Sequence, residues 1–195
     1  MSAATDLEAP VLLLAMPQVL DHHFHATVVL LLRHQDEGSF GFILNRPLQT
    51  SLAEIVADLG IREWTGDPDA CAYFGGPVQR QLGSVLFVPN YAGQLTGEGT
   101  SEVIPGLGMT HHIGDLERLA AEAPSRIRLF LGYAAWGEGQ LMEEILRNDW
   151  LTAPVSLDLL FAPEAETMWS DALRSVGVDP SSPPSWTGAD SAEAN

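Results

Sequence analysis

Short apolar runs separated by turn-forming residues fill the first part of the chain, and this spacing constrains the fold more than any other feature. Residues 11–15, 27–33 and 40–44 are such runs, and the first is followed by Met16-Pro17. Short runs of aliphatic and β-branched residues between turn signals are typical of buried strands. Residues 36–39 have turn chemistry, so we expect a β-hairpin with a loop of about four or five residues between the second and third runs.

Helical patterns become frequent later in the chain. Ser51 and Glu54 have the spacing of a capping box, so a helix is expected to start at Ser51 and to stop at Gly60. We further expect strands at residues 70–74, 85–88, 126–133 and 155–161, helices from 115, after 139 and over 164–176, and a long Gly- and Thr-rich loop over 90–108. Paired strands followed by helices predict an α+β fold with a mixed, largely antiparallel sheet and flanking helices.

Length and composition bound the number of domains. The chain has 195 residues, 46% of them hydrophobic, which suits one domain or at most two small ones. We expect a single domain over residues 10–178 and a flexible N-terminus over residues 1–9. Pro, Ser, Asp and Ala dominate residues 179–195, so these residues are expected to form a disordered acidic tail.

The charge balance limits the classes of partner. Nine Arg and no Lys stand against 26 Asp and Glu, which gives a formal net charge of −17. A field of this sign repels phosphate backbones and anionic lipid headgroups. It argues against DNA, RNA or a membrane surface as the main partner, although a local arginine cluster can still dominate a contact.

Cysteine usage and the N-terminal residues predict a cytoplasmic protein. Cys71 is the only cysteine, so no disulfide can form within the chain, and an inert buried thiol is expected. Asp6 and Glu8 stand where a signal peptide carries basic residues, and the apolar run 11–16 is too short for one. The later apolar run 28–32 cannot span a bilayer.

The histidines are the first candidates for a chemical site. If residues 21–25 were extended, Asp21, His23 and His25 would share one face and could hold zinc or another divalent ion, with His22 on the opposite face. One member of the pair His111-His112 could complete the site. No HExxH motif and no cysteine pair supports a metal centre. Solvated loop histidines are the favoured interpretation, and we expect neither a metal nor another cofactor.

A glycine-rich turn between an expected strand and helix is the second candidate. Backbone N–H groups of residues 132–140 could meet an anion at the positive end of the helix dipole. No Lys-Ser or Lys-Thr follows the glycines, so the segment is not a P-loop, and Glu138 would compete with an anion. The glycines equally suit close packing of strand and helix. No GxSxG motif marks a nucleophilic serine, and Glu143-Glu144 are expected on a solvated helix face.

Several separated motifs together resemble one bacterial family. They are Ala15-Met16-Pro17 with Asp21 and Phe24, residues 41–48, residues 74–78, Gly132-Tyr133-Ala134 with Trp136-Gly137 and residues 139–141, Glu144-Ile145, residues 148–151, residues 157–161, and Trp169. In this order they resemble the YqgE/AlgH family over about residues 10 to 180. Two positions depart from the family pattern: Gln18 and Ala135 stand where glycine is usual.

The resemblance implies an α+β domain whose bent, bifurcated sheet forms a pseudo-barrel. It implies no catalytic residues, because the family is largely uncharacterised, and some members are labelled transcriptional regulators. The family typically varies at the positions of His22, His23 and His25, which weakens the case for a metal site further.

The motif residues could meet in one groove. The predicted ligand-binding residues are Asn45, Arg46, Gly75, Gly76, Tyr133, Trp136 and Gln140, with Arg46 as the cation and Asn45 and Gln140 as hydrogen-bonding groups. Tight turns alone would also explain these residue types. We expect a non-enzymatic regulatory or interaction protein that binds a protein or a small molecule. The alternatives are an uncharacterised hydrolase or metal-dependent enzyme, and a transcriptional regulator.

Overall fold

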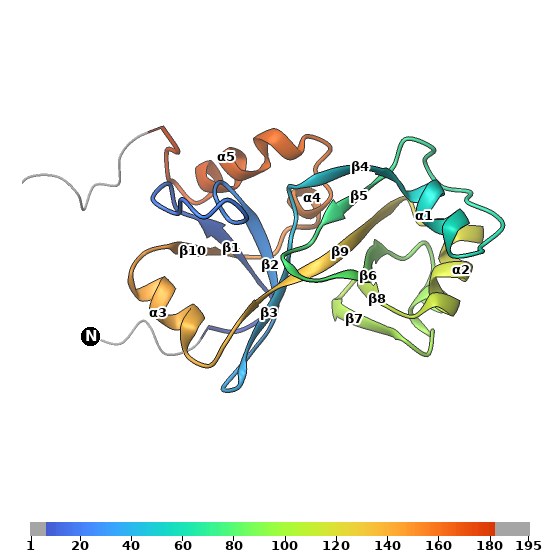
Figure 1. The fold of residues 1–195 in the computed structure, drawn as a ribbon, viewed down its shortest axis with the longest axis horizontal. Coiled ribbons are helices and arrows are strands. Elements are labelled where there is room, and N and C mark those ends of the chain that lie inside the picture. The colour runs from blue at the N-terminus through green and yellow to red at the C-terminus, as the bar shows by residue number, and fades with distance from the viewer. Residues whose placement is uncertain (1–6, 182–195) are drawn as a thin grey trace, which may run out of the picture.

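A curled sheet of ten strands is the frame of the computed structural model, which describes residues 7–181 (Figure 1). The strands are β1 (Val11–Ala15), β2 (Val28–Gln35), β3 (Gly38–Ile43), β4 (Pro47–Ser51), β5 (Cys71–Phe74), β6 (Val78–Val88), β7 (Thr100–Ile104), β8 (Leu107–Thr110), β9 (Arg126–Trp136) and β10 (Trp150–Ala153). The helices are α1 (Leu52–Asp58), α2 (Ile113–Ala121), α3 (Gln140–Leu146), α4 (Leu157–Leu160) and α5 (Ala165–Ser175), with a 3₁₀ turn over Ala92–Leu95.

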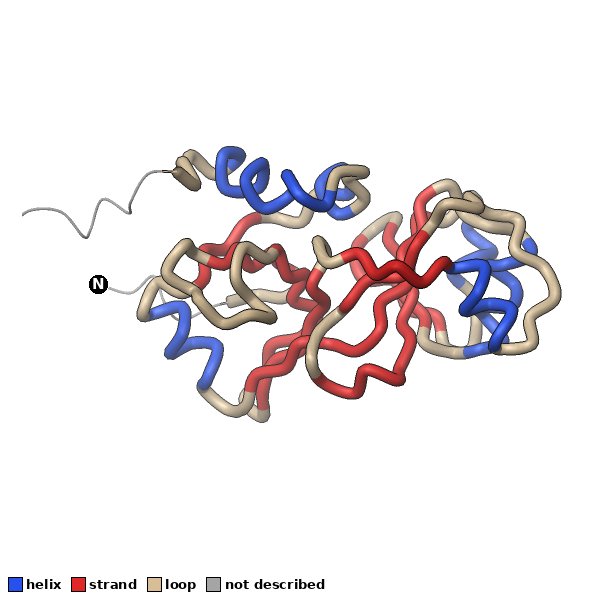
Figure 2. Tube along the Cα trace, turned by 45° about the horizontal axis from the view of Figure 1, so that its top comes forward, coloured by secondary structure: helices blue, strands red, loops and turns tan. Residues whose placement is uncertain are grey.

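The strand order is β10-β1-β2-β3-β9-β6-β8-β7, and β5 joins β9 to β4. The pair β5–β9 is parallel, whereas the other pairs among the described strands are antiparallel. Figure 2 shows the strands continuing through both halves of the molecule, with the helices at the periphery. The expected α+β class with a bent, largely antiparallel sheet and flanking helices is confirmed.

β9 organises the sheet because it changes partners along its length. On one edge, Phe130 and Leu131 pair with β5, and residues 134–136 then pair with β3. On the other edge, β9 pairs with β6 over residues 83–88. After an irregular stretch of β6, Val78 pairs with Tyr133. Gly132 has φ +73°, and a Cβ there would lie 2.5 Å from the Gly76 carbonyl oxygen. Only glycine suits this crowded left-handed position.

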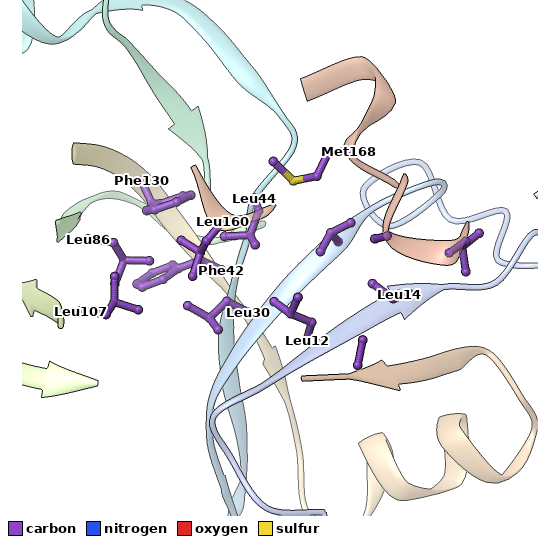
Figure 3. Close-up of a cluster of buried hydrophobic side chains, with 14 of the residues drawn as sticks. Leu12, Leu14, Leu30, Phe42, Leu44, Leu86, Leu107, Phe130, Leu160 and Met168 are labelled. Carbon is purple, nitrogen blue, oxygen red and sulfur yellow. The ribbon is translucent and has the colours of Figure 1, made fainter. Parts of the chain in front are cut away.

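Three hydrophobic clusters hold the elements together. The largest fills the inside of the curl and reaches under α4 and α5, and Figure 3 shows it running from Leu86 and Leu107 to Leu12 and Leu14. A second cluster lies beneath α1 and α2, and a third packs the opposite face of β1 and β2 against α3. The fully buried runs in β1 and β2 explain why these strands are almost continuously apolar in the sequence.

Several sequence predictions are confirmed and several are wrong. The α1 capping box forms as expected, with Ser51 as N-cap and reciprocal bonds to Glu54. The β2–β3 loop has two residues, because Gln35 pairs with Gly38. The expected loop over 90–108 contains β7 and much of β8, which turn at Pro105-Gly106. The expected strand over 155–161 is instead helix α4, with Ser156 as its N-cap.

The chain ends fall partly outside the described residues. The flexible N-terminus expected over residues 1–9 is described only from Leu7, which packs with Ala9 against the α3-side cluster. Most of the tail expected over residues 179–195 also lies outside the described range. Within residues 7–181, none of the helices is long and apolar enough to cross a membrane.

Candidate functional site

A cavity of about 650 Å³ borders the largest core cluster where β2, β3, β6, β8 and β9 meet, and we call it the central cavity. Residues from five strands line it, including Leu32 and Phe40 from the β2–β3 hairpin, Ser84 and Met109 from β6 and β8, and Tyr133 and Trp136 from β9. These residues are far apart in the sequence. They meet because β9 pairs with β3 on one edge and β6 on the other.

Aromatic rings form the floor of the central cavity. Phe40 and Tyr133 meet edge to face, with ring centroids 5.1 Å apart, and both pack against the core. The ring row continues from Phe40 to Phe42 at 5.2 Å and from Phe42 to Phe130 at 5.0 Å. The floor is therefore rigid and apolar, which suits a ligand with a flat apolar part.

Polar groups gather at the rim of the central cavity. Arg33, Glu37 and His111 are exposed there, and Arg33 makes no ion pair within residues 7–181. Ser39 is buried, and its Oγ lies 2.7 Å from His34 Nδ1. The rim therefore carries both a cationic and an anionic side chain, and neither sign of charge dominates.

Trp136 also belongs to a polar cluster behind the cavity wall, which we call the Glu144 cluster. Glu144 Oε2 accepts hydrogen bonds from Trp136 Nε1 and Trp150 Nε1, each at 2.8 Å. Gln140 Nε2 donates to Glu144 Oε1 at 2.9 Å, and Gln140 Oε1 accepts from the Gly137 N–H at 3.1 Å. Phe24 packs against both indoles. The cluster fixes the Trp136 ring, and a depression of about 350 Å³ beside it is lined by Trp136 and Gln140.

Asn45 and Arg46 hold the segment that precedes β2. Asn45 is buried, accepts from the Val28 N–H at 3.1 Å and donates to the Ala26 carbonyl at 3.0 Å. Arg46 donates to the His25 carbonyl, and partial burial lowers the pKa of Arg46. Both polar atoms of the Asn45 amide bond backbone groups, so this residue holds the segment before β2 in place.

Gly75 and Gly76 allow the chain to approach β9 closely. A Cβ on Gly75 would lie 2.2 Å from the Gly132 carbonyl oxygen, and one on Gly76 would lie 2.1 Å from the Tyr133 carbonyl carbon. Both glycines are buried. They place the backbone behind Tyr133 and so position its ring in the cavity.

The histidine segment is folded into turns rather than extended, which contradicts the condition for a shared metal-binding face. Asp21 Oδ1 accepts from the N–H groups of His23 and Phe24, and His25 Nδ1 lies 2.8 Å from the Val19 carbonyl oxygen. The His22 and His23 rings contact one another at a tilt of 45°, with centroids 3.7 Å apart. Within the described part of the chain, no three His, Cys, Asp or Glu side chains converge in a way that could hold a metal ion.

Known proteins resemble this chain in sequence and in architecture. Residues 12–181 match the model of the AlgH-like family, DUF179. The chain belongs to the AlgH-like family. A UPF0301 protein of Jannaschia sp. is 40% identical over 171 residues, covering 87% of this chain and 88% of the relative. A UPF0301 protein of Myxococcus xanthus is 36% identical over 172 residues, covering 88% and 92%.

Solved structures show the same AlgH-like fold. The solution structure of the AlgH protein from Pseudomonas aeruginosa aligns with a TM-score of 0.71 and 32% identity, covering 90% of this chain and 94% of that one. A crystal structure of protein DIP2367 from Corynebacterium diphtheriae aligns with a TM-score of 0.72 and 25% identity, covering 88% of each chain.

The structure of this AlgH-like chain divides the seven predicted site residues among different roles. Tyr133 and Trp136 line the central cavity, and Trp136 and Gln140 line the depression at the Glu144 cluster. Gly75 and Gly76 are buried in the backbone packing behind Tyr133. Asn45 and Arg46 hold the segment before β2 and line neither surface. Glu144 was expected on a solvated face, but it is half-buried and accepts three hydrogen bonds. In the sequence, this role of Glu144 was indicated only by the two nearby tryptophans and by Gln140 at the i, i+4 spacing.

Proposed function

We propose that this AlgH-like protein is a non-enzymatic interaction protein whose central cavity takes an apolar ring, either of a small molecule or of a partner protein's side chain. The observation that carries the proposal is the cavity of about 650 Å³ with Phe40 and Tyr133 as its floor. This volume lies within the range of small-molecule sites, which are typically apolar with a few polar groups that set orientation. Ser84 at the wall supplies such a group.

The residues around the central cavity are held in fixed positions, which favours a preformed binding site. Trp136 is held by Glu144, and Tyr133 rests on the backbone of the two tightly packed glycines. A preformed aromatic floor loses little conformational entropy when a ligand arrives. In this proposal Tyr133 contacts the ligand and Trp136 lines the cavity. Gly75 and Gly76 pack behind Tyr133, and Gln140 belongs to the cluster that holds the Trp136 ring. Asn45 and Arg46 hold the segment before β2 and do not line the cavity.

Filling the cavity tests the proposal. Ala135 lines the cavity and is exposed, so Ala135→Phe should occupy the space above the floor. A library of small aromatic fragments is screened by ligand-observed NMR against the natural protein, Ala135→Phe and Thr152→Phe. Thr152 is an exposed strand position on β10 and is the matched control.

Fragments that bind the natural protein and Thr152→Phe, but not Ala135→Phe, support the central cavity as the binding site. Fragments that bind all three proteins equally, or an absence of any binding fragment, count against it.

The Ser39–His34 pair favours a hydrolase as the second candidate, because a serine that touches an imidazole at a cavity wall has the beginnings of a nucleophile. The geometry differs from the usual triad: His34 uses Nδ1 toward the serine, and no carboxylate within residues 7–181 orients its ring through a hydrogen bond. Labelling by a fluorophosphonate that disappears in Ser39→Ala would favour the hydrolase over the binding protein.

A further inference from the structure

A separate depression of about 560 Å³ lies at the opposite end of β9 from the central cavity. Its walls include Cys71 and Tyr73 of β5, Ser125, Arg126 and Arg128 at the start of β9, and Phe161 after α4. We call it the Arg128 pocket. It differs from the central cavity because its most buried polar group is a cation.

The Arg128 side chain is held firmly at this position. The residue is 5% exposed, Nη1 donates to the Leu44 carbonyl at 3.1 Å, and Nη2 donates to the Ala162 carbonyl. Its guanidinium carbon lies 4.4 Å from the centre of the Tyr73 ring. These contacts fix the plane and direction of the guanidinium.

The charge of Arg128 is not matched by an anion of the chain. Within residues 7–181, no carboxylate forms an ion pair with it, and its two hydrogen bonds use two of the five N–H donors that a guanidinium carries. Burial lowers the pKa of Arg128, which shows that the surroundings disfavour the cation. The charge therefore meets only neutral groups, two carbonyls and the Tyr73 ring, and lacks an anion to balance it.

The charges around the pocket restrict what could neutralise Arg128. Arg126 adds a second cation, since its partner Asp158, 3.0 Å away, is 88% exposed and holds it weakly. Asp67 and Asp69 also line the depression and repel a multiply charged anion. The balance favours a ligand with a single negative charge, and Phe161 and Ile127 offer apolar surface beside it.

We propose that the Arg128 pocket binds a small molecule through a single carboxylate, which accepts hydrogen bonds from the free N–H groups of Arg128 while an apolar body rests against Phe161 and Ile127. Guanidinium and carboxylate are matched in geometry and charge. This site is distinct from the central cavity and does not depend on the function proposed for that cavity.

Cys71 provides a built-in reporter for the test. It is the only cysteine of the chain and lies in the pocket wall. The rate at which a disulfide reagent modifies Cys71 is measured with benzoate, acetate or inorganic phosphate, at constant ionic strength with chloride as reference. Benzoate should slow modification saturably, acetate should do so more weakly, and phosphate least. In Arg128→Lys, which loses the planar fork, the benzoate Kd should rise about tenfold or more. Arg62→Lys, an exposed arginine, is the matched control and should bind as the natural protein does.

A second measurement keeps the test decisive if Arg128→Lys fails to fold. Benzoate titrated into the natural protein should shift the backbone amide NMR signals of Ser125 and Ile127. Absence of both protection and shifts with every anion would overturn the pocket, as would equal protection in folded Arg128→Lys. Tighter binding of phosphate than of benzoate would overturn the carboxylate assignment.

Discussion

Glu144 concentrates three donors on one half-buried carboxylate, with two indole N–H groups on a single oxygen. Hydrogen bonds to a charged acceptor are stronger than neutral ones, and a donor left without an acceptor carries the full cost of its desolvation. The residue therefore links α3 to the ends of β9 and β10. Glu143, its neighbour in the sequence, is exposed, and its side chain makes no hydrogen bond within residues 7–181.

Replacing Glu144 by Gln should lower the free energy of unfolding by about 1–3 kcal/mol, because an amide N–H must then face one of the three donors. Denaturant unfolding followed by tryptophan fluorescence measures the change. Glu143→Gln is the control and should stay within about 0.5 kcal/mol of the natural protein. Equal effects of the two substitutions would contradict the role assigned to Glu144.

Asp115 joins the start of α2 to β7 and β8. It accepts hydrogen bonds from the Gly99 N–H at 3.0 Å, Thr100 Oγ1 at 3.0 Å and Thr110 Oγ1 at 3.1 Å, and Arg118 lies 3.5 Å away. Burial raises the pKa of Asp115, but these hydrogen bonds and the Arg118 charge outweigh burial and lower it below the ordinary value of 3.8.

This lowered pKa predicts a pH dependence of stability. A group whose pKa is lower in the folded state stabilises the fold above its unfolded pKa and loses that contribution as pH falls toward the folded pKa. The stability gap between the natural protein and Asp115→Asn should therefore be full at neutral pH and shrink as pH falls below 3.8. Chemical denaturation across this range measures it, and a gap that is independent of pH would contradict the prediction.

At the residue scale, the sequence predicted some of the residues that line the two cavities and missed others for a physical reason. Tyr133 and Trp136 stood out because they flank glycines at a strand end. Phe40 and Arg128 lie within strands whose sequences are typical of core strands, and their place in a cavity depends on pairings between distant segments. Local sequence patterns carry no information on such pairings, so only the fold reveals these residues.

At the level of elements, prediction succeeded where a local signal decides the conformation. The Ser51 and Glu54 spacing locates the start of α1, and the apolar run 11–15 coincides with β1. It failed over 155–161, because a short apolar run suits a buried helix as well as a strand. It also failed over 90–108, where the Pro105-Gly106 turn between β7 and β8 was hidden among many Gly and Thr residues.

The α1 capping box gives a prediction for that element. Ser51→Ala removes the acceptor for the Glu54 N–H and should cost about 1 kcal/mol of stability, since α1 carries Leu52 and Val56 into its core cluster. Thermal and denaturant unfolding measure the loss, with Thr50→Ala, an exposed neighbour, as the control. A loss no greater than that of the control would show that packing alone holds α1.

For the whole molecule, the net charge of −17 predicts weak association with nucleic acid. We expect no complex with duplex DNA in a gel-shift assay even at low salt, where electrostatic attraction is strongest. A complex whose affinity falls steeply as salt is added would instead support the transcriptional-regulator alternative, and would direct attention to local arginine clusters.

The row of rings inside the barrel has a thermodynamic consequence. It runs from Tyr133 through Phe40, Phe42 and Phe130 to Tyr73, which lies 5.8 Å from Phe130 and beneath Arg128. Figure 3 shows its central pair, Phe42 and Phe130. The two proposed binding sites thus stand at the two ends of one row of ring contacts. Any shift of this row that favours an occupant at one end changes the affinity at the other, and by reciprocity each occupant alters the other's Kd by the same factor.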